Sequence, residues 1–189
     1  MEPNKDLTTE QSLAIITSMI KNAKGNMRES SFYFLFWGWI VTIASLAEFY
    51  LNVYTDFAQP YIVWLIGIPG WIITMIYGAR HSKNESVSTY SDGLIKWIWI
   101  GFTISILIII FGGKYFNYQI TALILLLSGF ATFINGLIIR YKPIIIGGAS
   151  FWIFSPIALY VGVHYAPLVM AIAVLFGYLI PGYLLKKSK

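Results

Sequence analysis

The feature that most constrains this chain is an apolar stretch of twenty residues, 32–51, which reads FYFLFWGWIVTIASLAEFYL. It carries a single charged side chain, Glu48, near its C-terminal end. At about 1.5 Å of rise per residue, a helix of this length spans roughly 30 Å, the thickness of the hydrocarbon core of a bilayer. We therefore expect residues 32–51 to form a membrane-spanning helix.

Five further stretches of the same kind follow along the chain. The expected spans are residues 32–51, 60–79, 97–113, 119–139, 143–162 and 165–185. Hydrophobic residues make up 58% of the chain and charged residues 11%, against about 25% charged residues in soluble domains. A water-soluble fold of 189 residues could not bury so much apolar surface. The sequence therefore predicts an all-α, polytopic membrane protein, in which residues 31–189 form a six-transmembrane-helix bundle.

Residues 1–30 precede the spans and are mostly polar, with no short apolar stretch after a basic start, so we expect no signal peptide among them. Apolar residues recur here at steps of three and four, which predicts an amphipathic helix ending at a break at Gly25 and Asn26. The apolar positions are Leu13, Ile16, Ile20, Ala23 and Met27. Two interpretations stay open, a helix lying on the cytoplasmic membrane surface or a docking helix for a soluble partner or second subunit.

Basic residues are distributed very unevenly between the two sides of the expected bundle. With the N-terminus inside, twelve of the 13 lysines and arginines are cytoplasmic and only Lys114 lies outside. The positive-inside rule therefore predicts that both termini are cytoplasmic. Since the basic residues flank hydrophobic spans, we attribute the net charge of +5 to orientation and do not expect nucleic-acid binding.

Small and polar residues recur on one face of each expected span. Lipid tails are as apolar as leucine, so membrane helices associate through close packing of small residues and a few hydrogen bonds. We expect these faces to point into the bundle. They comprise Gly38, Thr42, Ser45, Glu48 and Asn52; Gly67, Gly70, Thr74 and Gly78; Gly101, Ser105 and Gly112; Thr121, Ser128, Thr132 and Asn135 with Gly129 and Gly136; Gly148, Ser155 and Gly162; and Ala166, Ala173 and Gly177.

Three prolines, Pro69, Pro156 and Pro181, fall inside expected spans. Each removes a backbone donor and crowds the carbonyl four residues earlier, so we expect kinks. The run Ile68-Pro69-Gly70-Trp71 is echoed by Ile180-Pro181-Gly182-Tyr183. Such breaks expose backbone groups to ligands in transporters, but proline is also common in ordinary spanning helices, and both interpretations stay open.

Glu48 is the only formal charge inside the expected spans. Intramembrane carboxylates are costly and are candidates for functional sites. Glu48 lies roughly 5 Å from the outer helix end, where the helix dipole disfavours a carboxylate. We therefore expect a compensating partner near the outer surface, with Lys114, His164 or a tyrosine hydroxyl such as that of Tyr160 as the options. The alternatives are a proton or ligand site and a simple interfacial carboxylate.

The candidate polar or ligand site combines this carboxylate with other polar residues at membrane depth or at the outer surface. We expect the first-span members to face a cavity open to the outside. The amide of the fourth span serves either as a ligand group or as a hydrogen-bond partner of a neighbouring helix. The candidate residues are Glu48, Ser45, Thr42, Asn135 and His164.

Catalysis, cofactors and metals are not expected. There are no cysteines, the two histidines fall at opposite membrane faces, and no GxSxG, HExxH or Walker motif occurs. An intramembrane enzyme needs two or more convergent catalytic groups, and only one acidic side chain lies at membrane depth. The sequence therefore predicts no catalytic, cofactor-binding or metal-binding residues and no enzyme.

The N-terminal third resembles a group of small, uncharacterised bacterial inner-membrane proteins. The residues that carry the resemblance are Glu10-Gln11-Ser12-Leu13, Met19-Ile20 and Phe34-Leu35-Phe36-Trp37-Gly38-Trp39. The resemblance covers roughly residues 8–50 and implies a bacterial cytoplasmic membrane, with no activity attached. The six-span layout is also similar to that of substrate-binding subunits of vitamin uptake systems, by shape alone.

Two functions are consistent with these features. The first is a non-enzymatic interaction or regulatory membrane protein, whose partners are membrane lipids and, through the N-terminal helix, a second copy or another protein. The alternative is a small-solute transporter, channel or membrane substrate-binding subunit with a polar site near Glu48. A tightly packed interior favours the first function, and a cavity containing Glu48 favours the second.

Overall fold

The computed structural model describes the backbone of residues 9–82 and 90–187 and the side chains of residues 31–80 and 93–187. Every regular element in these residues is helical. Six helical stretches are long and apolar enough to cross a membrane: Ser31–Tyr54, Pro60–Arg80, Gly93–Phe111, Ile120–Ile138, Lys142–Val161 and Ala166–Lys187. The predicted spans agree with these stretches to within four residues at every boundary. The predicted all-α, six-span fold is therefore confirmed.

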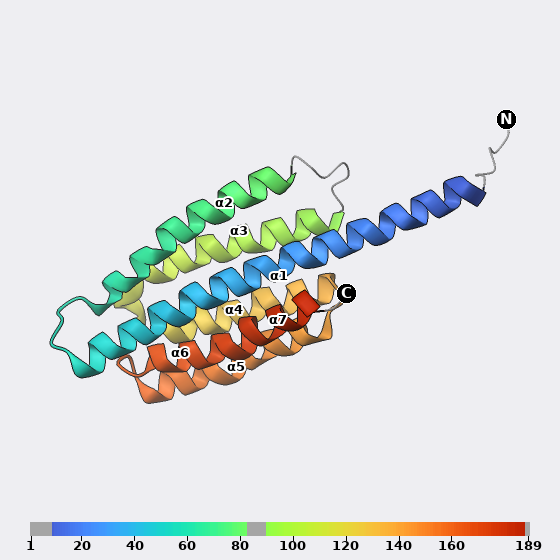
Figure 1. Cartoon of the computed structure of the whole chain (residues 1–189). Coiled ribbons are helices and arrows are strands. Elements are labelled where there is room, and N and C mark those ends of the chain that lie inside the picture. Colours follow the sequence, from blue (N-terminus) through green and yellow to red (C-terminus); the bar gives the residue numbers. More distant parts are fainter. Residues whose placement is uncertain (1–8, 83–89, 188–189) are drawn as a thin grey trace.

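The first span is part of a much longer helix, α1, which runs without interruption over the 46 residues Thr9–Tyr54. At 1.5 Å per residue this helix is about 69 Å long, more than twice the thickness of a hydrocarbon core. Its N-terminal half projects beyond the other helices as a rod (Figure 1).

The predicted break at Gly25 and Asn26 is wrong, because α1 passes through both residues. Glycine in a helix costs only about 1 kcal/mol relative to alanine, and asparagine costs less, so the pair need not end a helix. The N-terminal helix therefore exists as an extension of the first span and not as a separate element. The side chains of the predicted apolar stripe in residues 13–27 lie outside the described side chains.

The second span packs against the first, and the third span packs mainly against the fourth. A 3-10 helix, η1 (Pro60–Ile66), leads directly into α2 (Gly67–Ser82), and α3 (Tyr90–Phe111) forms the third span. The connection between these two spans lies between Ser82, where α2 ends, and Tyr90, where α3 begins. In Figure 1, α1 lies between α2 on one side and the C-terminal helices on the other.

The last three spans form a compact group. A short 3-10 turn, η2 (Gly113–Phe116), connects α3 to α4 (Ile120–Ile138), which pairs with α5 (Lys142–Val161). The sixth span consists of α6 (Ala166–Val174), a π-helical turn η3 (Leu175–Leu179) and α7 (Ile180–Lys187). It packs against both α1 and α5 and is the most buried span.

Two of the three prolines stand where the helix type changes. Pro69 is in the first turn of α2, directly after the 3-10 helix, and Pro181 is in the first turn of α7, directly after the π-helical turn. A proline cannot donate to the carbonyl four residues earlier, so the preceding turn adopts a different hydrogen-bond pattern. Each of the two Ile-Pro-Gly runs thus begins an α-helix directly after a turn of another helix type. Pro156 lies inside α5, as expected.

Glycines let the C-terminal helices approach to backbone contact. A Cβ atom added at Gly148 of α5 would lie 2.4 Å from the backbone nitrogen of Phe133 in α4. A Cβ atom added at Gly147 would lie 2.7 Å from the carbonyl oxygen of Gly177 in the sixth span. Both distances are shorter than real side chains allow, so these crossings require glycine.

The predicted inward-facing stripes are largely confirmed in the first, fourth, fifth and sixth spans. Their buried members include Thr42, Ser45, Ser128, Thr132, Asn135, Gly148, Ser155, Ala166, Ala173 and Gly177. The prediction is wrong for Gly67, Gly101 and Gly162, where an added Cβ would meet nothing within 4 Å. None of the third span's hydrophobic window is buried within the described residues. A sequence shows which face is small, but not whether another helix covers it.

Two tryptophans connect α1 to helices on its two sides. The indole nitrogen of Trp37 donates to Thr74 Oγ1 of α2 at 3.1 Å, and that of Trp39 donates to the hydroxyl of Tyr183 in α7 at 3.2 Å. An added Cβ at Gly70 would lie 2.8 Å from Ile40 Cδ1, so α2 also approaches α1 closely. α1 therefore contacts α2 on one side and the sixth span on the other.

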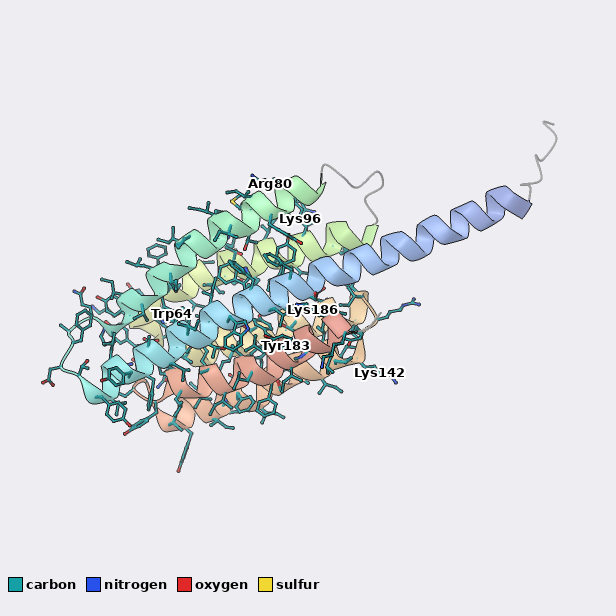
Figure 2. All side chains as sticks on the ribbon, viewed as in Figure 1. Trp64, Arg80, Lys96, Lys142, Tyr183 and Lys186 are labelled. Atoms are coloured by element: carbon teal, nitrogen blue, oxygen red, sulfur yellow. The ribbon has the colours of Figure 1, made fainter. Side chains whose placement is uncertain are left out.

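Basic side chains gather at one end of the bundle. Figure 2 shows Arg80, Lys96, Lys142 and Lys186 toward the end from which α1 projects. Trp64 lies toward the opposite end in the same view. Lys114, in the turn between α3 and α4, belongs to that opposite end as well. The grouping agrees with the uneven charge distribution expected from the sequence.

We predict that Gly148→Ala lowers the stability of the bundle by about 1–3 kcal/mol, since the new methyl group overlaps the backbone of Phe133. The matched control is Gly101→Ala, which faces open space and should be neutral or stabilising by up to about 1 kcal/mol. Thermal unfolding in detergent, followed by circular dichroism, measures both. Equal effects of the two substitutions would contradict backbone contact between α4 and α5 at Gly148.

Candidate functional site

The carboxylate at the centre of the predicted site is bonded to an indole. Glu48 lies in the last two turns of α1 and is partly buried. The indole nitrogen of Trp64, in η1, donates to Glu48 Oε2 at 2.8 Å. This length is within the range of about 2.7–2.9 Å typical of charge-assisted hydrogen bonds. The compensating partner is therefore Trp64 and not one of the residues expected from the sequence, Lys114, His164 or Tyr160.

The 3-10 helix η1 brings this partner to the carboxylate. The chain leaves α1 at Tyr54 and re-enters the bundle at Pro60, so the start of η1 lies beside the end of α1. Trp64 and Glu48 are both a few residues from that connection, which places them at matching depth. Matching residue depths across the first hairpin would have identified Trp64 as a partner from the sequence.

Thr42 and Ser45 share one face of α1 but do not form an outward-facing cavity. Thr42 Oγ1 donates to the carbonyl oxygen of Gly38 at 2.7 Å, within its own helix. Ser45 is fully buried, and its hydroxyl has no hydrogen-bond partner among the described residues. On the same face, an added Cβ at Gly38 would overlap Leu179 of the sixth span. This face of α1 is therefore packed against protein, contrary to the expected opening.

Asn135 lies in a second, separate polar cluster. It is buried on α4 toward the basic end of the bundle, on the same face as Ser128 and Thr132. The phenol of Tyr178, in the π-helical turn, lies beside the hydroxyls of Thr132 and Ser128. The Oδ1 atom of Asn135 is buried without a hydrogen-bond partner among the described residues. This cluster links the fourth and sixth spans and is distant from Glu48 along the bundle.

His164 occupies a third position. It lies in the turn between α5 and α6 and is exposed. The five predicted site residues therefore do not form one site. Glu48, Thr42 and Ser45 lie on α1, Asn135 lies in the cluster on α4, and His164 lies in an exposed turn. Among residues 31–80 and 93–187, no three histidine or acidic side chains come close enough to hold a metal ion.

An open apolar groove lies on another face of the bundle, between α3, α4 and α5. Its volume is about 380 Å³. It is lined by Ile109, Leu123, Leu126, Leu127, Phe130 and Trp152. None of the residues predicted to form a site lines it. The sequence gives no sign of this groove, because its walls are ordinary span residues brought together only by packing.

No family model matches this chain, and no curated protein or solved structure is significantly similar to it. The function must therefore be inferred from the geometry of the chain itself.

We predict that Trp64→Phe destabilises the protein by about 1–3 kcal/mol, because the Glu48 carboxylate loses its donor in a partly buried position. In a Glu48→Leu background the same substitution should cost much less, since neither partner then requires a hydrogen bond. Unfolding of all four proteins in detergent gives the coupling free energy. Trp71→Phe, at an exposed position of α2, is the matched control. Strictly additive effects would show that the pair contributes no interaction.

Proposed function

We propose that this chain is a multi-pass protein of the bacterial cytoplasmic membrane with a non-enzymatic, interaction or regulatory role. In this proposal the N-terminal half of α1 carries the surface that contacts a partner. The observation that supports it is the continuity of α1 over Thr9–Tyr54, which joins a projecting rod to the central helix of the bundle.

The orientation belongs to the same proposal. The end from which α1 projects is also the end with Arg80, Lys96, Lys142 and Lys186. By the positive-inside rule, that end faces the cytoplasm. The projecting half of α1 would then extend into the cytoplasm, and both chain termini would lie on that side.

A continuous helix also gives the proposed role a physical mechanism. A partner that tilts or rotates the projecting half of α1 must move the spanning half with it, because no break separates them. The spanning half bonds to α2 through Trp37 and Thr74 and to α7 through Trp39 and Tyr183. Binding on the cytoplasmic side would thus act on contacts on both sides of α1.

The alternative function, small-solute transport or binding near Glu48, has less support. Glu48 is bonded to Trp64, and Thr42 and Ser45 on the same helix face are buried against protein. The backbone contacts at Gly147 and Gly148 add to a tightly packed interior among the described residues. A tight interior is the arrangement that favours an interaction role over a solute pathway.

We predict that a photo-crosslinking amino acid at Ile16 or Ile20 forms adducts with a protein in native membranes. These residues lie on the apolar stripe of the sequence, whereas Asn22 lies off it and serves as the same-helix control. Ile146, an exposed residue of the fifth span, serves as the lipid-facing control. Adducts are identified by gel mobility and mass spectrometry after purification of the full chain.

The expected result is a discrete protein adduct at Ile16 or Ile20 that is weaker or absent at both control positions. The identified partner should also lose co-purification when residues 1–30 are deleted, while the bundle keeps its thermal unfolding transition. Adducts to lipid alone at the stripe positions would instead indicate a surface-lying helix and would contradict the proposal.

A further inference from the structure

We propose that the apolar groove between α3, α4 and α5 holds an acyl chain of one phospholipid, and that Lys114 binds the phosphate of the same molecule. The site is independent of the projecting half of α1 and is formed entirely by described residues.

The lining of the groove suits a hydrocarbon chain. All six side chains that line it are apolar or aromatic. The one polar hydrogen among them, on the indole nitrogen of Trp152, is already donated to the carbonyl oxygen of Leu126 at 3.2 Å. Water in such a space needs two to four polar partners, which these walls do not offer. The volume of about 380 Å³ is within the range of about 300–1,000 Å³ of small-molecule sites.

The aromatic wall of the groove is held in place by close packing. An added Cβ at Gly129 would lie 2.5 Å from the ring of Trp152, so the indole lies directly on the backbone of α4. The ring also contacts that of Phe133, with centroids 5.2 Å apart. The wall is therefore part of the α4–α5 hairpin and does not depend on a bound ligand.

Lys114 lies in the turn that joins two of the helices lining the groove. Ile109 is two residues before the end of α3 and Leu123 is in the first turn of α4, so the groove reaches the level of the turn that joins these helices. Lys114 is in that turn and is exposed. Backbone hydrogen bonds hold the turn, including Gly112 N–H to Ile108 O at 2.8 Å and Tyr118 N–H to Gly113 O at 2.9 Å.

The charge and depth of this turn match a lipid headgroup. Tyr115, the next residue, is 89% exposed, as expected for an aromatic side chain in the headgroup region. A phospholipid carries its negative phosphate at the end of its apolar chains, and Lys114 lies in the turn that joins two of the helices lining an apolar groove. A lysine ammonium and a phosphate form a charge-assisted hydrogen bond. The groove and the lysine therefore fit one phospholipid molecule better than they fit a purely apolar partner helix.

The test measures lipid retention by the full chain with native mass spectrometry in detergent, with phosphatidylglycerol and diacylglycerol added as separate probes. The unmodified chain should retain one phosphatidylglycerol molecule. Lys114→Gln should weaken its retention about fivefold, the effect expected of one basic residue near a charged membrane surface, and leave diacylglycerol unchanged. Leu127→Trp, which fills the groove, should weaken retention of both probes.

Two substitutions serve as matched controls. Ile146→Trp adds the same side chain on an exposed position of α5 outside the groove, and Lys142→Gln removes a basic residue at the opposite end of the bundle. Neither should change retention. If Leu127→Trp fails to fold, Ile109→Trp fills the groove from α3 instead.

Three outcomes would overturn the proposal. The first is retention of phosphatidylglycerol that none of the groove or Lys114 substitutions changes. The second is equal retention of both probes regardless of Lys114. The third is a dimer without lipid that Leu127→Trp converts to a monomer, which would identify a second copy as the occupant.

Discussion

Close approach of helix backbones at glycine is the interaction on which the rest of this structure depends. In lipid no hydrophobic effect drives one apolar helix onto another, so stability must come from dense packing and a few hydrogen bonds. Gly148 brings α5 onto the backbone of α4, and Gly147 brings α5 onto Gly177 of the sixth span. The sixth span in turn packs on α1 at Gly38. These crossings join four of the six spans. They also determine where the polar residues of the interior lie.

The second and third spans lack this kind of support, which explains their different character. α2 approaches α1 closely at Gly70 and through the Trp37–Thr74 hydrogen bond, but Gly67 and Gly101 face open space. Helices that bury little of their surface against the bundle are largely in contact with lipid. The apolar groove lies where the loosely packed α3 passes the tightly packed α4–α5 hairpin.

The architecture could be predicted from the sequence because it depends on span length and hydropathy, which are local properties. The small faces of the four well-packed spans could be predicted as well, since glycine and serine are sparse enough to mark a face. Three features could not. The continuity of α1 through Gly25 depends on a free-energy difference too small for a sequence pattern to decide. The exposure of Gly101 depends on which helices become neighbours. The Trp64 partner of Glu48 depends on how the chain returns after Tyr54.

The Glu48–Trp64 pair also affects how many positive charges are needed at its end of the bundle. A partly buried carboxylate needs a donor, and a lysine or arginine could have supplied one only by adding a positive charge at the end of the bundle that is otherwise poor in them. An indole satisfies the carboxylate without that charge. Lys114 is therefore not required for Glu48 and is exposed in the turn between α3 and α4. The proposed binding of a whole phospholipid, and not of an acyl chain alone, depends on this exposed basic residue in the turn between two of the helices that line the groove.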